Sequence, residues 1–480
     1  MQKDLTLLID FYELTMANSY FELGRQDEIA YFDFFFRAIP DNGGYAIFAG
    51  LEQLIEYIEN LSFEEEEIEY LRSKKIFSEE FLKYLKNFKF KGSIYSFKEG
   101  YPIFPGEPII TVKGPIIDCQ IIETALLLTV NHQSLIATKA SRIVESAQGR
   151  IVMEFGARRA HSYDAANYGA RAAYISGVDG TSNTYLDFIA GVPALGTMAH
   201  SYVQSFDSEY EAFLAYAKTY PNDTLLLVDT YDTLRQGIPN AIKVHKEYLE
   251  PRGSYLKGIR IDSGDLTYLT KKAREMLDAE GLTETKITVS NSLDEYLIKD
   301  LLQQGAKIDS FGVGERLITA KSEPVFGGVY KLVAIEKNGI LEPKIKVSDT
   351  VIKTTTPGFK QVYRFFDKND KAIADVVTLS DEVINTNEPY LLFDPDHPWK
   401  QKLVTDYTVE PMLTTIYDNG KLVYKKPTLD EIRETKRDQL SRLWVEVRRL
   451  EYPHRYYVDL SKPLWDLKQK LIQEHSKIKR

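Results

Sequence analysis

The sequence predicts an α/β protein, with an irregular (β/α) barrel of about seven strands and an α+β domain built from the N-terminal and C-terminal segments. Between about residues 150 and 335, short apolar runs end in polar or glycine clusters and alternate with helix-length segments, which is typical of βα units. On both sides of this region, aromatic strand-like runs mix with amphipathic helices. The 480 residues are 44% hydrophobic and 27% charged, as in ordinary globular chains of several domains.

Three segments follow from these changes of pattern. Residues 1–145 form the N-terminal α+β segment, residues 146–335 the barrel, and residues 336–480 a segment that packs with the first. In the first segment, Leu51, Leu54, Ile55 and Ile58 recur at helical spacing and predict a helix. In the last, Thr428 and Glu431 form the pattern of a capping box and predict a helix start.

The expected barrel strands are best identified by the residues at which they end. We expect seven ends, at Glu154, Asp179, Thr197, Asp229, Asp262, Asn291 and Gly312. Ser292 with Glu295 predicts a capping box for one intervening helix, which Gly305 ends. A second helix, LTYLTKKAREML, follows Ser263 and Gly264 and stops at Gly281.

Charge and cysteine content exclude several classes of function. Sixty basic against seventy acidic residues give a formal net charge of −10 without basic runs, which disfavours nucleic-acid and anionic-membrane partners. The one cysteine, Cys119, excludes a disulfide within the chain and every multi-cysteine metal site. No run of eighteen apolar residues and no secretory leader pattern occurs. We therefore expect a cytoplasmic enzyme.

The segment RIDSGD carries the first group of candidate functional residues, because ligands of parallel α/β sheets bind beyond the carboxyl ends of the strands. Arg260 could bind a carboxylate or phosphate, and Asp262 and Asp265 a magnesium ion or a sugar hydroxyl. A surface ion-pair cluster is the alternative. Arg260 lies inside a strand, where a buried guanidinium needs a partner, and this favours function.

Two further strand ends carry charged groups. Arg158 and Arg159 follow a strand beside Glu154, so one arginine could pair with that carboxylate while the other faces solvent. Asp229 and Asp232 could bind a metal or hydroxyls, although the second could equally be the N-cap of the next helix.

A glycine pair and a histidine complete the candidates at the strand ends. Gly312 and Gly314 lead from a strand into a helix start, where backbone N–H groups bind phosphate, although a tight turn requiring positive φ is the simpler interpretation of the motif alone. His200 follows the strand-end pair Gly196 and Thr197, and its imidazole could serve as acid, base or nucleophile. Near the N-terminus, Tyr12 could stack on a ring ligand or pack within its helix.

Ten segments in order along residues 10 to about 364 resemble the nicotinate phosphoribosyltransferases, of the type II phosphoribosyltransferase family. They are DFYELTM, NHQSLIATKASRI, EFGARRAH, GVDGTSN, GTMAHS, DTYDT, RIDSGDL, SFGVGERL, GGVYKLV and KTTTPGFKQVYR. The resemblance implies condensation of nicotinate with phosphoribosyl pyrophosphate to nicotinate mononucleotide and pyrophosphate in NAD synthesis. It also implies coupling to ATP hydrolysis, a requirement for Mg²⁺, and a homodimer with the active site at its interface.

The resemblance further implies roles for particular residues. His200 would be phosphorylated by ATP. Phe155, with Tyr12 reaching across from a second subunit, would enclose the pyridine ring, and Arg260 with Thr197 would bind the carboxylate of nicotinate.

The remaining implied roles concern the phosphorylated substrate. Arg158 and Asp262 would face the ribose-pyrophosphate, Gly312 and Gly314 the 5-phosphate, and Thr355 would also touch this substrate. No direct ligation of the metal by the protein is assigned.

Three alternatives remain open at this point. A nicotinamide-specific enzyme is favoured by Asp179, which aligns with an acid suited to an amide, whereas Thr181 and Ser182 would suit an acid substrate as hydroxyl donors. Quinolinate would require more cationic strand-end groups for its two carboxylates. A barrel isomerase or a phosphosugar-binding module would keep the phosphate contacts and leave His200 without a role.

Overall fold

The chain divides into two compact units. The computed structural model describes residues 5–348, 350 and 353–476. Unit 1 comprises Met1–Leu135 and Val325–Arg480, and unit 2 comprises Ile136–Pro324. Both breaks precede the boundaries expected from the sequence, after residues 145 and 335.

Unit 2 is built on a six-stranded parallel sheet in the order β7-β6-β11-β10-β9-β8. The strands are β6 (Ile151–Glu154), β7 (Gly180–Thr181), β8 (Leu225–Leu227), β9 (Gly258–Ile261), β10 (Lys286–Ser290) and β11 (Ser310–Val313). Its helices include α7 (Tyr163–Ile175), α8 (Thr184–Ala190), α9 (His200–Gln204), α10 (Glu209–Thr219), α11 (Ile238–Val244), α12 (Leu266–Ala279), α13 (Glu295–Gln303) and α14 (Glu315–Ile318). Short 3₁₀ and π segments are η2 (Ala157–Arg159), η3 (Thr233–Gly237), η4 (His245–Leu249) and η5 (Glu250–Arg252).

This sheet has fewer strands than the seven expected. The apolar run ending at Asp179 is wrong as a strand, because Ala172–Ile175 form the last turn of α7, in line with the high helix propensity of alanine. The run ending at Thr197 forms only one isolated bridge, between Thr181 and Ala194. Among the described residues, β7 and β8 are therefore the two edge strands of this sheet, and no pairing between them closes a barrel.

One helix start in unit 2 differs from the expected one, and another is confirmed: α12 begins at Leu266, the first residue of the expected helix. The N-cap of α13 is Asp294, whose side chain accepts from the Leu297 amide, so the expected capping box at Ser292 is wrong. Ser292 has φ of 50°, whereas an N-cap residue needs an extended backbone. Asp265 caps α12 by accepting from the Tyr268 amide at 3.0 Å.

Unit 1 combines strands from both ends of the chain in one antiparallel sheet of order β13-β12-β1-β5-β3-β19-β20. Its strands are β1 (Ile29–Phe35), β3 (Ser93–Ser96), β5 (Ile110–Pro115), β12 (Val329–Lys337), β13 (Ile340–Pro343), β19 (Thr414–Asp418) and β20 (Lys421–Leu422). The four-stranded sheet is β18 (Thr408–Pro411), β14 (Lys360–Phe366), β15 (Ala372–Leu379) and β21 (Val458–Leu460). Two-stranded pairs are β2 (Ala46–Ile47) with β4 (Pro102–Ile103) and β16 (Tyr390–Phe393) with β17 (Gln401–Val404).

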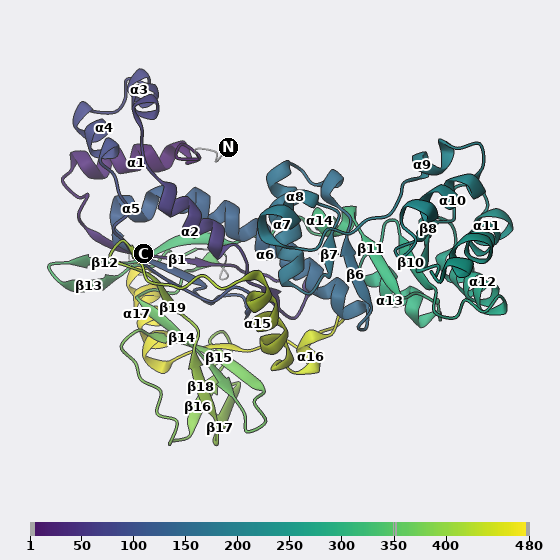
Figure 1. The fold of residues 1–480 in the computed structure, drawn as a ribbon. Helices are drawn as coiled ribbons and strands as arrows, with labels where there is room; N and C mark the ends of the chain where they lie inside the picture. The colour runs from purple at the N-terminus through teal and green to yellow at the C-terminus, as the bar shows by residue number, and fades with distance from the viewer. Residues whose placement is uncertain (1–4, 349, 351–352, 477–480) are drawn as a thin grey trace. The chain divides into compact units, whose positions relative to one another are not determined.

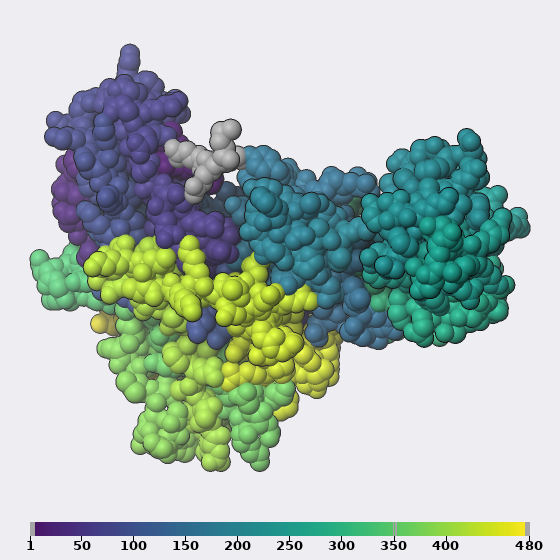
Figure 2. All heavy atoms as spheres, viewed as in Figure 1, coloured from purple at the N-terminus to yellow at the C-terminus, as the bar shows by residue number. Residues whose placement is uncertain are grey.

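The helices of unit 1 also come from both ends of the chain. They are η1 (Pro40–Asn42), α1 (Phe11–Glu22), α2 (Leu51–Asn60), α3 (Glu65–Ser73), α4 (Glu79–Lys86), α5 (Ile116–Ile121), α15 (Leu429–Ser441), α16 (Val445–Arg448) and α17 (Lys462–Ser476), while α6 (Glu123–Ser146) crosses the first break. The expected helix with Leu51 at its start is α2, and the capping box of Thr428 and Glu431 begins α15. In Figure 2, surface from the C-terminal segment borders surface from the N-terminal segment.

The core of unit 2 lies between the sheet and its helices. The strands β8, β9 and β10 are short apolar runs. Their residues Leu226, Ile259 and Ile287 are fully buried in one hydrophobic cluster with residues of α10, α11 and α12. Figure 1 shows α10, α11 and α12 around the β8 end of the sheet and α7, α8 and α14 near β6 and β7. This packing leaves the carboxyl ends of the strands to the loops, where the candidate residues lie.

Candidate active site

Parallel pairing brings five of the expected strand ends to one edge of the unit 2 sheet. Glu154 pairs with Val313, Gly312 with Ser290, Val289 with Ile261, and Leu227 with Arg260. The residues that follow these strands therefore share a single rim, as the alternation of strands and helices predicts.

Arg260 is a buried cation near this rim, on the strand beside the edge strand β8. It lies on β9, and its Nη1 donates to Thr197 Oγ1 at 2.8 Å while Nη2 donates to the Met198 carbonyl at 2.8 Å. Its Nε is buried and has no hydrogen-bond partner among the described residues. Burial lowers the pKa of Arg260 although Asp262 and Asp229 act against that shift. A guanidinium that is held by neutral groups and keeps an unused N–H is suited to bind an anion.

His200 begins α9 and is 40% exposed. Its Nδ1 lies 3.1 Å from Thr230 Oγ1 and its Nε2 lies 3.8 Å from Asp262 Oδ2. Asp262 in turn accepts a short hydrogen bond from Ser290. Thr230 therefore orients the imidazole through Nδ1, while Nε2 makes no hydrogen bond to Asp262 and part of the ring remains open to solvent. Such a group can accept a proton or a phosphoryl group.

Asp229 at the end of β8 supports the loop that carries Asp262. Its Oδ2 accepts from the Asp262 amide at 3.0 Å and from the Ser263 hydroxyl at 2.6 Å, while its Oδ1 is buried without a hydrogen-bond partner in the described part of the chain. Asp232 instead accepts from the Leu234 and Arg235 amides and is the N-cap of η3. Asp229 and Asp262 thus belong to the rim, whereas Asp232 and Asp265 cap helices.

The glycine pair Gly312 and Gly314 is explained in part by an aromatic ring. A Cβ atom at Gly312 would lie 2.5 Å from Phe155 Cδ2, and one at Gly314 would lie 3.1 Å from the Phe155 carbonyl oxygen. Neither glycine has positive φ, so the expectation of a turn that requires it is wrong. The sheet therefore needs Gly312 because the ring of Phe155 lies directly against it.

The carboxyl group of Glu154 has a different role from the expected one. It is fully buried and accepts from Thr181 Oγ1 at 2.6 Å and from the Gly156 amide in a short hydrogen bond, so the expected ion pair with an arginine is wrong. Burial raises its pKa. Arg159 approaches Glu315 at 4.0 Å instead. Arg158 is exposed and makes no ion pair within the residues that the structure describes, so its guanidinium is available to a ligand.

The side chain of Asp179 lies near the start of β6, whereas the rim lies at the end of β6. Its Oδ2 accepts from the Val152 amide at 2.9 Å, near the start of β6, and its own amide donates to the Val152 carbonyl. The carboxylate of Asp179 therefore accepts a backbone hydrogen bond near the start of β6 and does not face the rim. Thr181, at the end of β7, and the Ser182 amide contact the rim through Glu154.

Two of the expected site residues belong to unit 1. Tyr12 lies in the first turn of α1 and is 46% exposed, and burial together with the neighbouring Glu123 raises the pKa of its hydroxyl. Thr355 is buried, and its hydroxyl accepts from the Lys346 amide at 2.9 Å. The hydroxyl of Thr355 is thus already engaged within its own loop.

Sequence reasoning missed two hydroxyl groups of the rim, Thr230 and Ser290. Both lie at the carboxyl end of a strand, next to an aspartate or asparagine that was considered. The positional signal was therefore present, but nothing in the residue type separates a rim hydroxyl from an ordinary solvated one.

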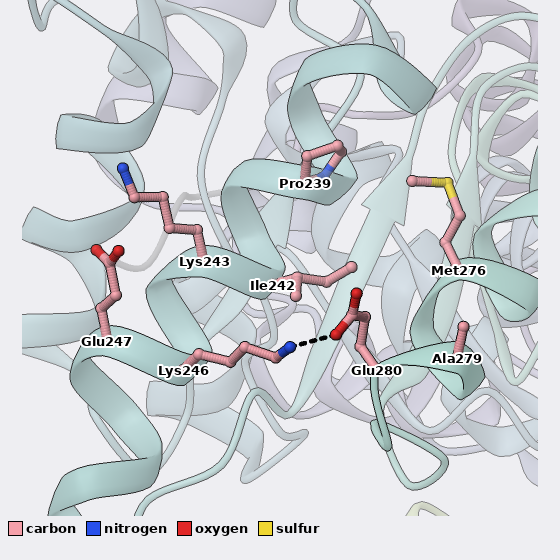
Figure 3. A pocket seen from close by; sticks show the side chains of 8 residues that line it. All are labelled: Pro239, Ile242, Lys243, Lys246, Glu247, Met276, Ala279 and Glu280. Carbon is pink, nitrogen blue, oxygen red and sulfur yellow. Dashed lines mark hydrogen bonds and ion pairs between the residues drawn. The ribbon is translucent and has the colours of Figure 1, made fainter.

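A cavity of about 460 Å³ lies elsewhere in unit 2, lined by residues of α11, η4 and α12 (Figure 3). Its charged groups are already paired: Lys246 with Glu280, Lys243 with the ring of Tyr210, and Glu247 with the Tyr210 hydroxyl. None of the rim residues lines it, so we assign it no part in the chemistry.

Metal-binding clusters and membrane-spanning helices are both absent from the described residues. No group of three or more histidine, cysteine, aspartate or glutamate side chains is placed to hold a metal ion there. In the same part of the chain, every helix is too short or too polar to cross a membrane. Asp229 Oδ1 and the Asp262 carboxylate still fit Mg²⁺, because this ion is often held by one or two carboxylates together with substrate phosphates.

Comparison with known proteins gives a consistent result along the chain. The N-terminal domain of nicotinate phosphoribosyltransferase (NAPRTase) matches residues 7–131. The NAPRTase family matches residues 151–383, and the C-terminal domain of nicotinate phosphoribosyltransferase matches residues 359–468. The Bacillus subtilis (strain 168) nicotinate phosphoribosyltransferase is 46% identical over 471 residues, covering 98% of this chain and 96% of that protein. The Homo sapiens nicotinate phosphoribosyltransferase is 30% identical over 527 residues, covering 98% of this chain and 97% of that protein.

Solved structures agree with the sequence relatives. The crystal structure of human nicotinic acid phosphoribosyltransferase superposes with a TM-score of 0.84 at 29% identity, covering 97% of this chain and all of that one. The nicotinate-nucleotide pyrophosphorylase from Pyrococcus furiosus gives a TM-score of 0.69 at 25% identity, with 91% and 95% covered. With full-length relatives at this identity, the chain belongs to the nicotinate phosphoribosyltransferase family.

Proposed function

We propose that this protein is an ATP-coupled nicotinate phosphoribosyltransferase that forms nicotinate mononucleotide and pyrophosphate from nicotinate and phosphoribosyl pyrophosphate. The observation that carries the proposal is the set of side chains around Arg260. Its guanidinium is held by Thr197 and Met198, keeps a buried N–H unused, and shares its rim with His200 and two carboxylates. This arrangement suits a small aromatic anion beside a phosphorylated substrate.

Arg260 and Phe155 would hold the nicotinate. The carboxylate of nicotinate would accept from Arg260, which Thr197 orients, and the pyridine ring would lie against Phe155, itself supported by Gly312. Tyr12 is exposed in the first turn of its helix and could cover the other face of the ring from a second copy of the chain. We therefore propose a homodimer.

The glycosyl transfer requires little acid–base chemistry. The lone pair of the pyridine nitrogen attacks C1 of the ribose, the bond from C1 to the pyrophosphate oxygen breaks, and the pyrophosphate leaves with that electron pair. The protein must orient the two reactants and stabilise the departing charge. Arg158 is free for this task, Gly312 and Gly314 would contribute backbone groups near the 5-phosphate, and Thr355 would touch the same substrate.

Mg²⁺ would neutralise pyrophosphate oxygens when bound. Asp262 and Asp229 would hold it, directly or through water, because Asp229 Oδ1 is a buried oxygen without a partner among the described residues. Asp229 also fixes the Asp262 loop through the Asp262 amide.

His200 would carry the energy coupling. One imidazole nitrogen attacks the γ-phosphorus of ATP, an N–P bond forms, and the bond to the ADP oxygen breaks. Water later attacks the phosphohistidine and releases inorganic phosphate. Thr230 lies within hydrogen-bond distance of Nδ1 and would orient the ring for this transfer, while Nε2 lies 3.8 Å from Asp262.

Nicotinate is favoured over nicotinamide by two features. Arg260 supplies a cation for a carboxylate, and Asp179, the acid that would suit an amide, is engaged with the Val152 amide at the start of β6. A role in NAD synthesis in the cytoplasm follows from the substrate, and the buried free thiol of Cys119 is compatible with a reducing compartment.

The test uses the purified full-length chain with Mg²⁺, phosphoribosyl pyrophosphate and either nicotinate or nicotinamide, with and without ATP. We expect nicotinate mononucleotide, a higher kcat/KM for nicotinate, and an acid-labile, base-stable phosphate on the His200 peptide. Faster turnover of nicotinamide would refute the substrate assignment.

His200→Ala separates this transferase from an isomerase or a binding module. We expect loss of both the labile phosphate and the nicotinate-stimulated hydrolysis of ATP. His397→Ala is the matched control, because His397 is 41% exposed and also lies beside a carboxylate, Asp394, but in unit 1. Unchanged ATP hydrolysis in His200→Ala would reject His200 as the phosphoryl carrier.

A further inference from the structure

The turn that carries Phe155 is held by a buried carboxyl group that the proposed chemistry does not use. Glu154 is fully buried, and no cation pairs with it among the described residues. Both of its oxygens instead accept hydrogen bonds, Oε2 from Thr181 Oγ1 at 2.6 Å and Oε1 from the Gly156 amide. A buried carboxyl group is costly unless hydrogen-bonded, so these two donors decide its position.

The same turn is packed tightly on its other sides. A Cβ atom at Gly156 would lie 2.7 Å from Glu154 Oε1 and equally close to Ile318, so the turn has no room to shift without losing these contacts. The Phe155 amide donates to the Val313 carbonyl at 2.8 Å, and the ring lies against Gly312. The place of the ring therefore depends on the backbone at Phe155 and Gly156.

Thr181 connects this turn with the next loop. Its hydroxyl donates to Glu154 and accepts from the Asn183 amide at 3.0 Å, and the Ser182 amide donates to the Glu154 carbonyl at 2.8 Å. Glu154 is thus the point at which the ends of β6 and β7 are joined by side chains as well as by backbone.

We propose that Glu154 is a positioning residue for the pyridine substrate: with Thr181, it holds the turn that places the Phe155 ring. This inference rests on the proposed function, in which Phe155 contacts the substrate ring. Glu154 itself touches neither substrate and acts through Phe155 alone.

Thr181→Val tests the proposal, because it removes the hydroxyl and preserves the shape of the side chain. We expect the KM for nicotinate to rise about two- to tenfold, the range for a misplaced aromatic contact, with kcat and the KM for phosphoribosyl pyrophosphate nearly unchanged. Thr181→Ser keeps the donor and should restore the wild-type KM. Glu154→Gln, which reverses the polarity toward Thr181, should resemble Thr181→Val.

Thr285→Val is the matched control for a lost buried hydroxyl. Thr285 is fully buried in the same unit and donates to the Leu256 carbonyl at 2.9 Å, before the start of β10 and away from the rim. Both valine variants should lower the thermal midpoint, but only Thr181→Val should raise the KM for nicotinate. Amide exchange in a peptide covering residues 155–160 should likewise accelerate only in Thr181→Val.

A double-mutant cycle with Phe155→Leu decides whether the effect passes through the ring. We expect Thr181→Val to add nothing to the KM of Phe155→Leu, because coupled residues are not additive. Additive effects, or a Thr181→Val enzyme with the KM of the wild type, would overturn the role of Glu154. A wild-type chain that forms no mononucleotide would instead refute the proposed function, and amide exchange would still decide whether Glu154 and Thr181 hold the turn.

Discussion

Replacement of Arg260 by glutamine should weaken the preference of this enzyme for nicotinate over nicotinamide. The guanidinium makes two hydrogen bonds, to Thr197 and to the Met198 carbonyl, and keeps its buried Nε–H for an anion. A hydrogen bond to a charged group contributes about 1.5–3 kcal/mol. Because each 1.4 kcal/mol is a factor of ten, kcat/KM for nicotinate should fall about 10- to 150-fold.

The assay is the ratio of kcat/KM for nicotinate to that for nicotinamide, which cancels general damage to the site. Glutamine can still donate to one of the two protein acceptors, so we expect the fold to survive. Arg274→Gln is the matched control, because Arg274 also donates to backbone carbonyls in unit 2, those of Leu282 and Thr285, but lies away from the rim. An unchanged ratio in Arg260→Gln would refute the assignment of the carboxylate to this residue.

Three further predictions concern packing and buried charge. Gly312→Ala should raise the KM for nicotinate, measured in steady state, because its new methyl group would displace the ring of Phe155; a KM equal to that of the wild type would contradict the assigned contact. Asp375→Asn should lower the free energy of unfolding in denaturant by about 3–5 kcal/mol, because it leaves the fully buried Arg364 without its bidentate partner; a loss below 1 kcal/mol would argue against a buried ion pair. Burial, with Asp394 nearby, raises the pKa of Asp459 to about 7. In the unfolded chain this carboxyl group ionises at a lower pH. The wild type should therefore become less stable relative to Asp459→Asn as the pH rises from about 4 to about 7. Thermal midpoints of the two proteins that keep a constant difference over this range would contradict the last prediction.

Local pattern was sufficient for the elements with strong periodicity and clear end signals. The helix that begins at Leu51 and the capping box at Thr428 follow from side chains a few residues apart, and the structure has both. The run before Asp179 failed because an apolar stretch rich in alanine fits a buried strand and a helix end equally well, and only packing distinguishes them.

The sequence by itself predicted that Asp229, Asp262 and Gly312 lie at one rim, since the carboxyl ends of parallel strands meet at one edge of a sheet. The place of His200 did not follow in this way, because the run before it forms only an isolated bridge. Only the tertiary structure decided what each side chain does there. Asp179 and Asp262 both end apolar runs, yet one bonds the start of β6 and the other faces the imidazole of His200. The reason is physical: the direction of a side chain depends on the register between neighbouring strands and on which donors are within about 3 Å, and both are set by contacts between residues far apart in the chain.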